Sequence, residues 1–127
     1  MSSFLGARVL VVDDAGTVRR MVCAMLAQSG YAVLEAANGN DALKILNDPS
    51  ETVHLVLTDV VMPEMTGAEL AQHLAHSRPK LPVIFMSGYN DDPVVRRMEE
   101  QGTSFLAKPF TTAVLIEKVR RVLSEAQ

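Results

Sequence analysis

With 127 residues, of which 48% are hydrophobic and 21% charged, the chain suits one globular domain over residues 1–127 and leaves no room for a second. The net charge of −3 excludes a general attraction to nucleic acid or anionic lipid, and without a long apolar stretch or a leader we expect a cytoplasmic protein. The single cysteine, Cys23, excludes an internal disulfide, and its apolar helical pattern predicts a buried side chain rather than a reactive thiol.

Short apolar runs and helical patterns alternate along the chain. The runs are typical of strands covered on both faces and lie at 8–12, 32–34, 54–58, 82–86 and 103–107. Helical spacing follows each run: the first helix stops near Gly30, Asn38 caps the second, the third spans 67–77, the fourth starts at Asp92-Pro93, and Thr111 caps the last. Five such strand–helix units predict a parallel sheet with right-handed crossovers and helices on both faces.

The helices differ in how much apolar surface they offer to the sheet. The first carries an apolar stripe that we expect to face inward, formed by Val18, Met21, Val22, Met25 and Leu26. The last carries a comparable stripe formed by Val114, Leu115, Val119, Val122 and Leu123. The fourth is thin, and its large apolar residues are Val94, Val95 and Met98. We therefore expect the fourth helix to belong to the surface whose binding partner changes.

Polar residues follow four of the five apolar runs, at the point where each strand should end. They are Asp13, Asp14, Asp59, Ser87 and Lys108. Taken singly, each is typical of a turn, a helix cap or a loop. Because parallel strands end at one edge of a sheet, all five side chains should converge on the edge where open α/β sheets bind ligands.

Three carboxylates brought together repel one another, at about 4 kcal/mol for each pair 4 Å apart in an effective dielectric of 20. A hard divalent cation offsets this repulsion, and an all-oxygen ligand set favours Mg²⁺ over zinc. A carboxylate beside Mg²⁺ and the Lys108 ammonium is a suitable nucleophile for phosphoryl transfer, with Ser87 placed to hydrogen-bond the transferred group.

The motifs that carry these residues resemble the receiver domain of two-component response regulators. The resemblance runs from about Arg8 to Leu123 and rests on four stretches: Val-Val-Asp-Asp at 11–14, Thr-Asp-Val-Val-Met-Pro-Glu-Met-Thr-Gly at 58–67, Met-Ser-Gly-Tyr at 86–89 and Lys-Pro-Phe at 108–110. It implies a flavodoxin-like α/β fold with five parallel strands in the order 2-1-3-4-5. It also implies a cis peptide bond between Lys108 and Pro109.

The same resemblance assigns roles to individual residues. Asp59 would be the phosphoacceptor, with Lys108 and Ser87 beside it. The metal site would hold Mg²⁺, for which Mn²⁺ can substitute, through Asp14 directly, Asp13 largely through water, Asp59, and the backbone carbonyl of Val61. Ser87 would be the hydroxyl switch and Phe105 the rotating aromatic, together remodelling the surface of the fourth helix, fifth strand and fifth helix. The apolar Val61 and the bulky Tyr89 depart from the commonest pattern, and we expect Val61 to shield the phosphoryl group.

The partners implied are a histidine kinase or a histidine phosphotransfer domain, because the chain lacks a phosphorylated-histidine box of its own. The motifs are most similar to receivers at the C-termini of hybrid sensor kinases. The domain would then be a signalling phosphoacceptor rather than an enzyme, with self-phosphorylation and self-dephosphorylation chemistry. It would contact neither nucleic acid nor membrane itself, and homodimer formation stays open.

Two other functions fit parts of this pattern. A receiver that acts only by docking would not need its acidic set, which is intact here. A phosphohydrolase of the haloacid-dehalogenase kind also uses Asp, Mg²⁺ and Lys, but it needs an Asp-x-Asp motif where this chain has Asp13-Asp14-Ala15.

Two further groups of residues favour simpler interpretations. His73 and His76 could bind a metal, but solvated side chains are the better prediction because no third ligand is near in sequence. The arginine pairs on helices are expected to be solvated, with partner docking as the alternative: Arg19-Arg20, Arg96-Arg97 and Arg120-Arg121.

Overall fold

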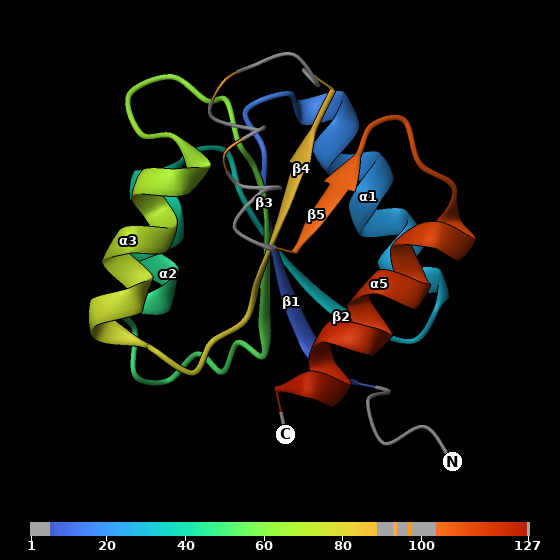
Figure 1. The fold of residues 1–127 in the computed structure, drawn as a ribbon. Helices are drawn as coiled ribbons and strands as arrows, with labels where there is room; N and C mark the ends of the chain where they lie inside the picture. Colours follow the sequence, from blue (N-terminus) through green and yellow to red (C-terminus); the bar gives the residue numbers. More distant parts are fainter. Residues whose placement is uncertain (1–5, 89–92, 94–96, 98–103, 127) are drawn as a thin grey trace.

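The computed structural model describes residues 6–88, 93, 97 and 104–126, and these form one parallel sheet between two layers of helices (Figure 1). The strands are β1 (Arg8–Val12), β2 (Ala32–Ala36), β3 (Leu55–Asp59), β4 (Val83–Ser87) and β5 (Phe105–Ala107). The helices are α1 (Gly16–Gln28), α2 (Gly39–Leu46), α3 (Gly67–Ser77) and α5 (Thr112–Glu125). Pro93 and Arg97 are helical, whereas Asp92, Val94, Val95 and Met98 of the predicted fourth helix lie outside the described residues, as does Tyr89.

The sheet has the strand order β2-β1-β3-β4-β5, and all neighbouring pairs are parallel. This confirms the flavodoxin-like α/β arrangement implied by the motifs. Val12 pairs with Thr58, Asp59 with Met86, and Ser87 with Ala107, so the last residues of adjacent strands lie side by side. The carboxyl ends of β1, β3, β4 and β5 therefore form one edge.

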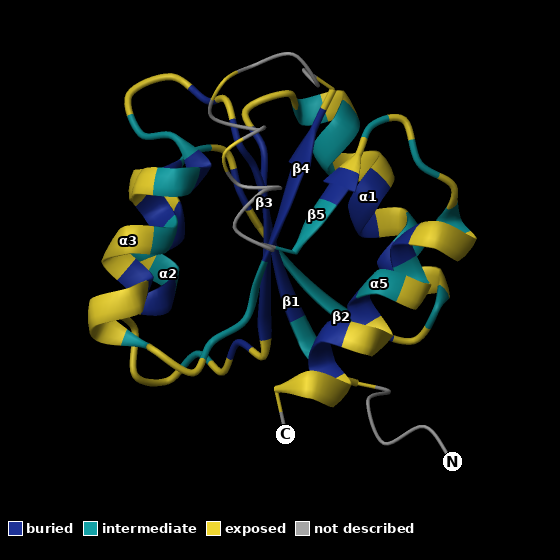
Figure 2. Ribbon diagram, in the orientation of Figure 1, coloured by how far each residue is buried: buried dark blue, intermediate teal, exposed yellow. Residues whose placement is uncertain are grey.

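Each face of the sheet has its own apolar core. Alternate residues of a strand point to opposite faces, so Val9 and Val11 of β1 pack with α1 and α5, and Leu10 and Val12 pack with α2 and α3. All four side chains are completely buried. Figure 2 shows the same division, because buried residues fill the sheet and the inner sides of the helices while exposed residues lie outside. The β-branched runs thus form strands because both of their faces are covered.

Two apolar residues expected to face inward lie on the surface instead. Met21 is 50% exposed and Val114 is 51% exposed. The buried residues of α1 are Val22, Cys23 and Leu26, so its inner face is centred further round the helix than predicted. In α5 the buried positions Leu115, Val119, Val122 and Leu123 define the stripe, and Val114 precedes it by one residue, about 100° of rotation.

Other local predictions are confirmed. The Asn38 side chain accepts a hydrogen bond from the Asp41 amide at 2.8 Å, and Thr111 accepts one from the Val114 amide at 3.2 Å, so both residues cap their helices. Burial raises the pKa of the Cys23 thiol to about 11, which suits an inert core residue. Of the helices in the described ranges, none is long and apolar enough to cross a membrane.

Candidate functional site

The residues predicted from the strand ends converge at the carboxyl edge of the sheet. Asp13 follows β1, Asp59 and Ser87 are the last residues of β3 and β4, and Lys108 follows β5. Asp13, Asp14 and Asp59 each offer a carboxylate oxygen, and these three oxygens lie within 4.8 Å of one another. The carboxylates line a surface pocket of ≈ 800 Å³ together with Lys108 and the loop after β3.

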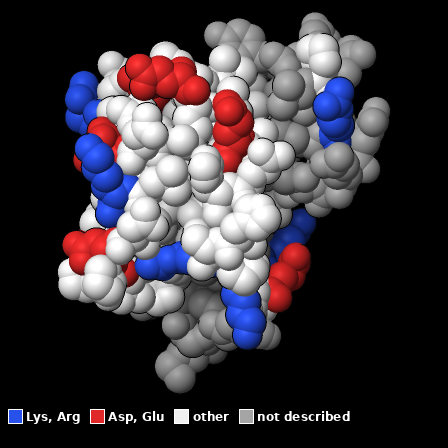
Figure 3. Space-filling view, turned by 90° about the vertical axis from the view of Figure 1, so that its left-hand side faces the viewer, with Lys and Arg blue, Asp and Glu red and all other residues white. Residues whose placement is uncertain are grey.

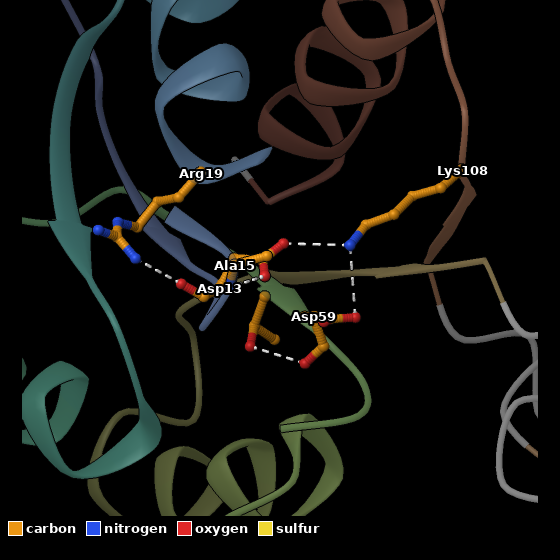
Figure 4. A network of polar contacts seen from close by, with 6 residues as sticks. Asp13, Ala15, Arg19, Asp59 and Lys108 are labelled. Carbon is orange, nitrogen blue, oxygen red and sulfur yellow. Dashed lines mark hydrogen bonds and ion pairs between the residues drawn. The ribbon is translucent and has the colours of Figure 1, made fainter. Parts of the chain in front are cut away.

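Asp13 is completely buried and is bonded through every one of its polar atoms. Its carboxylate accepts a hydrogen bond from the Ala15 amide at 2.9 Å and another from the Lys108 Nζ at 3.1 Å (Figure 4). Its own amide donates to the Ala36 carbonyl at 3.1 Å, and its carbonyl accepts from an Arg19 guanidinium nitrogen at 2.7 Å. Asp14, by contrast, is exposed. The cluster thus has one fixed carboxylate and one that reaches solvent.

Asp59 lines the pocket, and its side chain is 12% exposed. Burial raises the pKa of its carboxyl group, because the charged form loses its hydration. The Lys108 ammonium, with its Nζ 3.6 Å from the Asp59 Oδ1, lowers this pKa, while the negative charges of Asp13 and Asp14 raise it. The carboxyl group therefore binds a proton more tightly than an exposed aspartate does.

Lys108 joins two of the carboxylates. Its Nζ forms ion pairs with both Asp13 and Asp59, and Figure 4 shows the two contacts. Its amide donates to the Ser87 carbonyl at 2.9 Å, which ties the end of β5 to the end of β4. The peptide bond between Lys108 and Pro109 is cis, as expected. The lysine is thus positioned by the sheet and by the carboxylates it contacts.

The loop from β3 to α3 forms one wall of the pocket. Val61, Met62 and Pro63 line it, and the Val61 side chain is 43% exposed. Glu64 has a φ of 69°, and the Met65 amide donates to the Pro63 carbonyl at 2.7 Å across it. A hydrogen bond between residues two apart, around a positive φ, is the signature of a tight γ-turn. This turn brings the chain round sharply between Val61 and the start of α3.

Gly67 is a residue whose importance at the site was not predicted, although it ends the quoted 58–67 motif. A Cβ atom on Gly67 would lie 2.3 Å from the Asp59 carbonyl oxygen and 3.1 Å from the Val60 Cα. The Gly67 amide also donates to the Val60 carbonyl at 2.9 Å. The first turn of α3 therefore packs directly on the backbone that carries Asp59. Only glycine permits this close approach.

Arg19 is a second residue that the sequence pattern did not reveal. We expected solvated arginines on this helix, but only 17% of the Arg19 side chain is exposed, and it contacts Glu35 of β2 as well as the Asp13 carbonyl. Arg20 is exposed, as predicted. An i, i+4 pattern of charged residues within α1 does not indicate this contact, because Asp13 follows β1 and Glu35 lies on β2.

The remaining predicted residues lie apart from the carboxylates or beside them. Ser87 is completely buried at the end of β4, next to the pocket-lining Gly88. Phe105 is half-buried, packs against the cluster of Val60 and Phe85, and lines a separate groove beside α5. His73 and His76 are both exposed, as predicted for solvated side chains.

The donor set of the pocket matches the expected Mg²⁺ ion. The pocket presents carboxylate oxygens and is lined by Val61, and among the described residues that line it there is no histidine or cysteine. Hard oxygen donors of this kind match Mg²⁺ rather than zinc. Across residues 6–88, 93, 97 and 104–126, this is the one group of three or more acidic, histidine or cysteine side chains close enough to share an ion. The residues fit the ion.

Comparison with known proteins decides the family. Residues 9–120 match the family model of the response regulator receiver domain. The chain belongs to this family. As a receiver domain it is part of two-component signal transduction, and receivers bind Mg²⁺ at an acidic cluster such as the one described above.

The receiver's relatives include sensor kinases. It is 38% identical over 120 residues to the sensor kinase CckA of Brucella abortus, covering 94% of this chain but 13% of that protein. A solved receiver domain from the hybrid histidine kinase CckA is 36% identical with a TM-score of 0.77, covering 92% of this chain and 99% of that one. A CheY-like receiver from Methanospirillum hungatei JF-1 is 28% identical with a TM-score of 0.85, covering 95% and 96% of the two chains.

Proposed function

We propose that Asp59 accepts a phosphoryl group from a phosphohistidine on a partner domain, in a reaction that requires Mg²⁺. The observation that carries this proposal is the position of Lys108, whose Nζ lies 3.1 Å from the Asp13 carboxylate and 3.6 Å from the Asp59 carboxylate. A cation at the same edge would be held by Asp13, Asp14, Asp59 and the backbone carbonyl of Val61. Mg²⁺ would fill this role, and Mn²⁺ would substitute for it.

The chemistry follows from the positions of these residues. An Asp59 oxygen attacks the phosphorus atom and forms the new P–O bond as the donor's P–N bond breaks. The Lys108 ammonium stabilises the negative charge on the transferred oxygens and lowers the Asp59 pKa that burial raises. A cation held by these residues would supply further positive charge to the transferred oxygens. The exposed Val61 side chain, at the rim of the pocket, slows attack by water on the product.

Phosphorylation then acts as a switch on a surface away from the pocket. Ser87 hydrogen-bonds the phosphoryl group, and Phe105, now half-exposed beside a groove of α5, turns inward. The surface of the fourth helix, β5 and α5 is thereby remodelled. A local change in charge is read out at a distance, as in other phosphorylation switches.

A small phosphodonor tests the assignment of Asp59. Acetyl phosphate with Mg²⁺ should add one phosphoryl group to the wild type, detected by intact-mass spectrometry, and removal of Mg²⁺ by a chelator should prevent it. Asp59→Asn should take up none, whereas Asp41→Asn, an exposed aspartate on α2, should behave as the wild type does. Stoichiometric labelling of Asp59→Asn would show that the phosphoacceptor is another residue.

The same experiment separates the two other functions that fit the sequence. A receiver that acts only by docking would remain unlabelled under all conditions. A phosphohydrolase would turn over a phosphomonoester, which a signalling phosphoacceptor does not.

We further propose that residues 1–127 form a single receiver domain with its core at about 8–123, in the cytoplasm, which exchanges phosphoryl groups with a histidine kinase or histidine phosphotransfer domain. The names of its relatives support an origin in a hybrid sensor kinase. The chain spans 13%, 51% and 17% of the length of three curated relatives, so a role within a longer protein is proposed and rests on these relatives.

In Figure 3, acidic and basic residues are scattered over the side formed by α2 and α3, which suits a protein partner better than nucleic acid or membrane.

A further inference from the structure

We propose that Arg19 is a positioning residue, which together with Glu35 holds the Asp13–Asp14 turn in the shape that binds a divalent cation. The inference rests on the proposed function, because it concerns the same metal site. Arg19 contacts neither the pocket nor the reacting atoms. It acts through the backbone of Asp13, on the side of the turn that faces β2 and α1.

The geometry of Arg19 ties three elements together. Its Nη1 donates to the Asp13 carbonyl at 2.7 Å, and its Nε donates to the Glu35 Oε1 at 3.0 Å (Figure 4 shows the Asp13 contact). Arg19 comes from α1, Asp13 follows β1, and Glu35 lies on β2 opposite Val11. The Arg19 side chain is 17% exposed, so water competes little for these contacts.

The contact with the Asp13 carbonyl controls the direction of Asp14. This carbonyl and the amide of Asp14 belong to one planar peptide unit, so fixing the oxygen fixes the plane from which Asp14 leaves. Asp14 is exposed and the chain is turning there, so the plane determines where its carboxylate can reach. The Asp13 carboxylate is held separately, by Ala15 and Lys108. Arg19 therefore completes the set of contacts that shapes the acidic turn.

An arginine suits this role better than a lysine. Its planar guanidinium presents several N–H donors in a fixed fork, so one group can satisfy Asp13 and Glu35 together. The neighbouring Arg20 is exposed and provides a matched control on the same helix.

The charge of Arg19 and its positioning role have opposite effects on Mg²⁺ affinity. The direction in which the affinity changes in an Arg19 variant therefore shows which effect is larger. A positive charge near a cation site repels the incoming ion, so removing that charge alone should tighten Mg²⁺ binding. Removing a group that positions a ligand should weaken it, and loss of such supporting contacts typically lowers metal affinity by about 10–100-fold. Weaker binding by an Arg19 variant would therefore report geometry rather than charge.

The experiment is a Mg²⁺ titration of the apo domain, followed by amide NMR, with urea unfolding to confirm that each variant is folded. Arg19→Gln should raise the Kd by about tenfold, with Arg19→Lys and Glu35→Gln showing smaller increases in the same direction. Arg20→Gln should leave the Kd unchanged or lower it slightly. An Arg19→Gln Kd equal to or below that of Arg20→Gln would overturn the proposal.

A metal-free measurement separates this inference from the proposed function. The Ala15 amide is bonded to the Asp13 carboxylate, so its hydrogen exchange reports the shape of the turn without any ion. Exchange of this amide should be faster in Arg19→Gln and Glu35→Gln than in Arg20→Gln, and equal rates would count against Arg19. If Arg19→Gln fails to fold, Arg19→Lys, which keeps the positive charge, carries both measurements. Failure of the wild type to bind Mg²⁺ would instead refute the metal site.

Discussion

At the scale of single residues, the two buried carboxylates have different surroundings. Asp13 is bonded through its amide, carbonyl and both carboxylate oxygens, and it is completely buried. Asp59 has an ion pair with Lys108 at 3.6 Å and a backbone hydrogen bond with Val60, which lower its pKa, but burial together with Asp13 and Asp14 raises it. The residue proposed to react is therefore the one whose charge is less fully stabilised by the protein.

Replacing Asp59 with asparagine should stabilise the metal-free domain at neutral pH. The folded-state pKa of Asp59 is raised, so the folded chain binds a proton more readily than the unfolded chain, and wild-type stability falls as pH rises through this pKa. Asp59→Asn removes that loss, and we expect a gain on the order of 1 kcal/mol at pH 7, a common scale for single substitutions.

Urea unfolding in the presence of a chelator measures this difference. The gap between Asp59→Asn and the wild type should close as pH falls below ~3.9, the ordinary pKa of aspartate, where the wild-type group becomes protonated in both states. Asp41→Asn controls for the loss of one exposed negative charge. A gap that widens toward acid would contradict the prediction.

At the scale of secondary-structure elements, the start of α3 supports the end of β3. A capping box starts this helix: the Glu69 amide donates to the Thr66 side chain at 3.1 Å, and the Thr66 amide donates to the Glu69 carboxylate at 3.0 Å. Gly67 follows and packs on the Asp59 carbonyl. The helix therefore positions the backbone of the proposed phosphoacceptor.

Gly67→Ala should disturb this contact. The added Cβ would lie 2.3 Å from the Asp59 carbonyl oxygen. This oxygen is a backbone atom and cannot rotate away, so β3 or α3 must shift. We expect a loss of about 1–3 kcal/mol in the free energy of unfolding, the usual cost of overpacking, and slower phosphorylation by acetyl phosphate. Gly88→Ala is the control, because its Cβ would meet the Lys108 Cβ at an ordinary 3.8 Å. Equal stability of the two variants would show that the contact relaxes easily.

The elements themselves were largely predictable from the sequence, and the reasons are physical. The β-branched run of β1 is buried on both faces, and such runs identify central strands. The convergence of Asp13, Asp59 and Lys108 follows from parallel strands ending at one edge. Met21 and Val114 were predicted to be buried but are exposed, because the spacing of apolar residues does not show where the buried face of a helix ends. The Arg19 contacts and the γ-turn at Glu64 depend on packing between distant segments, which no local pattern records.

At the scale of the whole molecule, the proposed Mg²⁺ site should couple cation binding to unfolding. An ion that binds only the folded state stabilises it by RT ln(1 + [L]/Kd), which is about 1.4 kcal/mol at ten times the Kd. Thermal or urea unfolding should therefore show a rise in wild-type stability with added Mg²⁺. Asp14→Asn should lose most of this rise while remaining folded, because Asp14 is exposed. NaCl at the same ionic strength controls for general screening, and an equal gain with NaCl would refute specific binding.

Because folding already fixes the geometry of Asp13, part of the ordering that metal binding requires takes place during folding. Three like charges gathered at one sheet edge are a point of local frustration, a conflict that a sequence selected for stability alone would avoid. Folding already overcomes the conformational entropy of arranging Asp13, so an arriving ion needs to order little more than Asp14. Such preorganisation favours affinity at the expense of apo stability. The bound ion would then relieve a charge repulsion that the fold itself maintains.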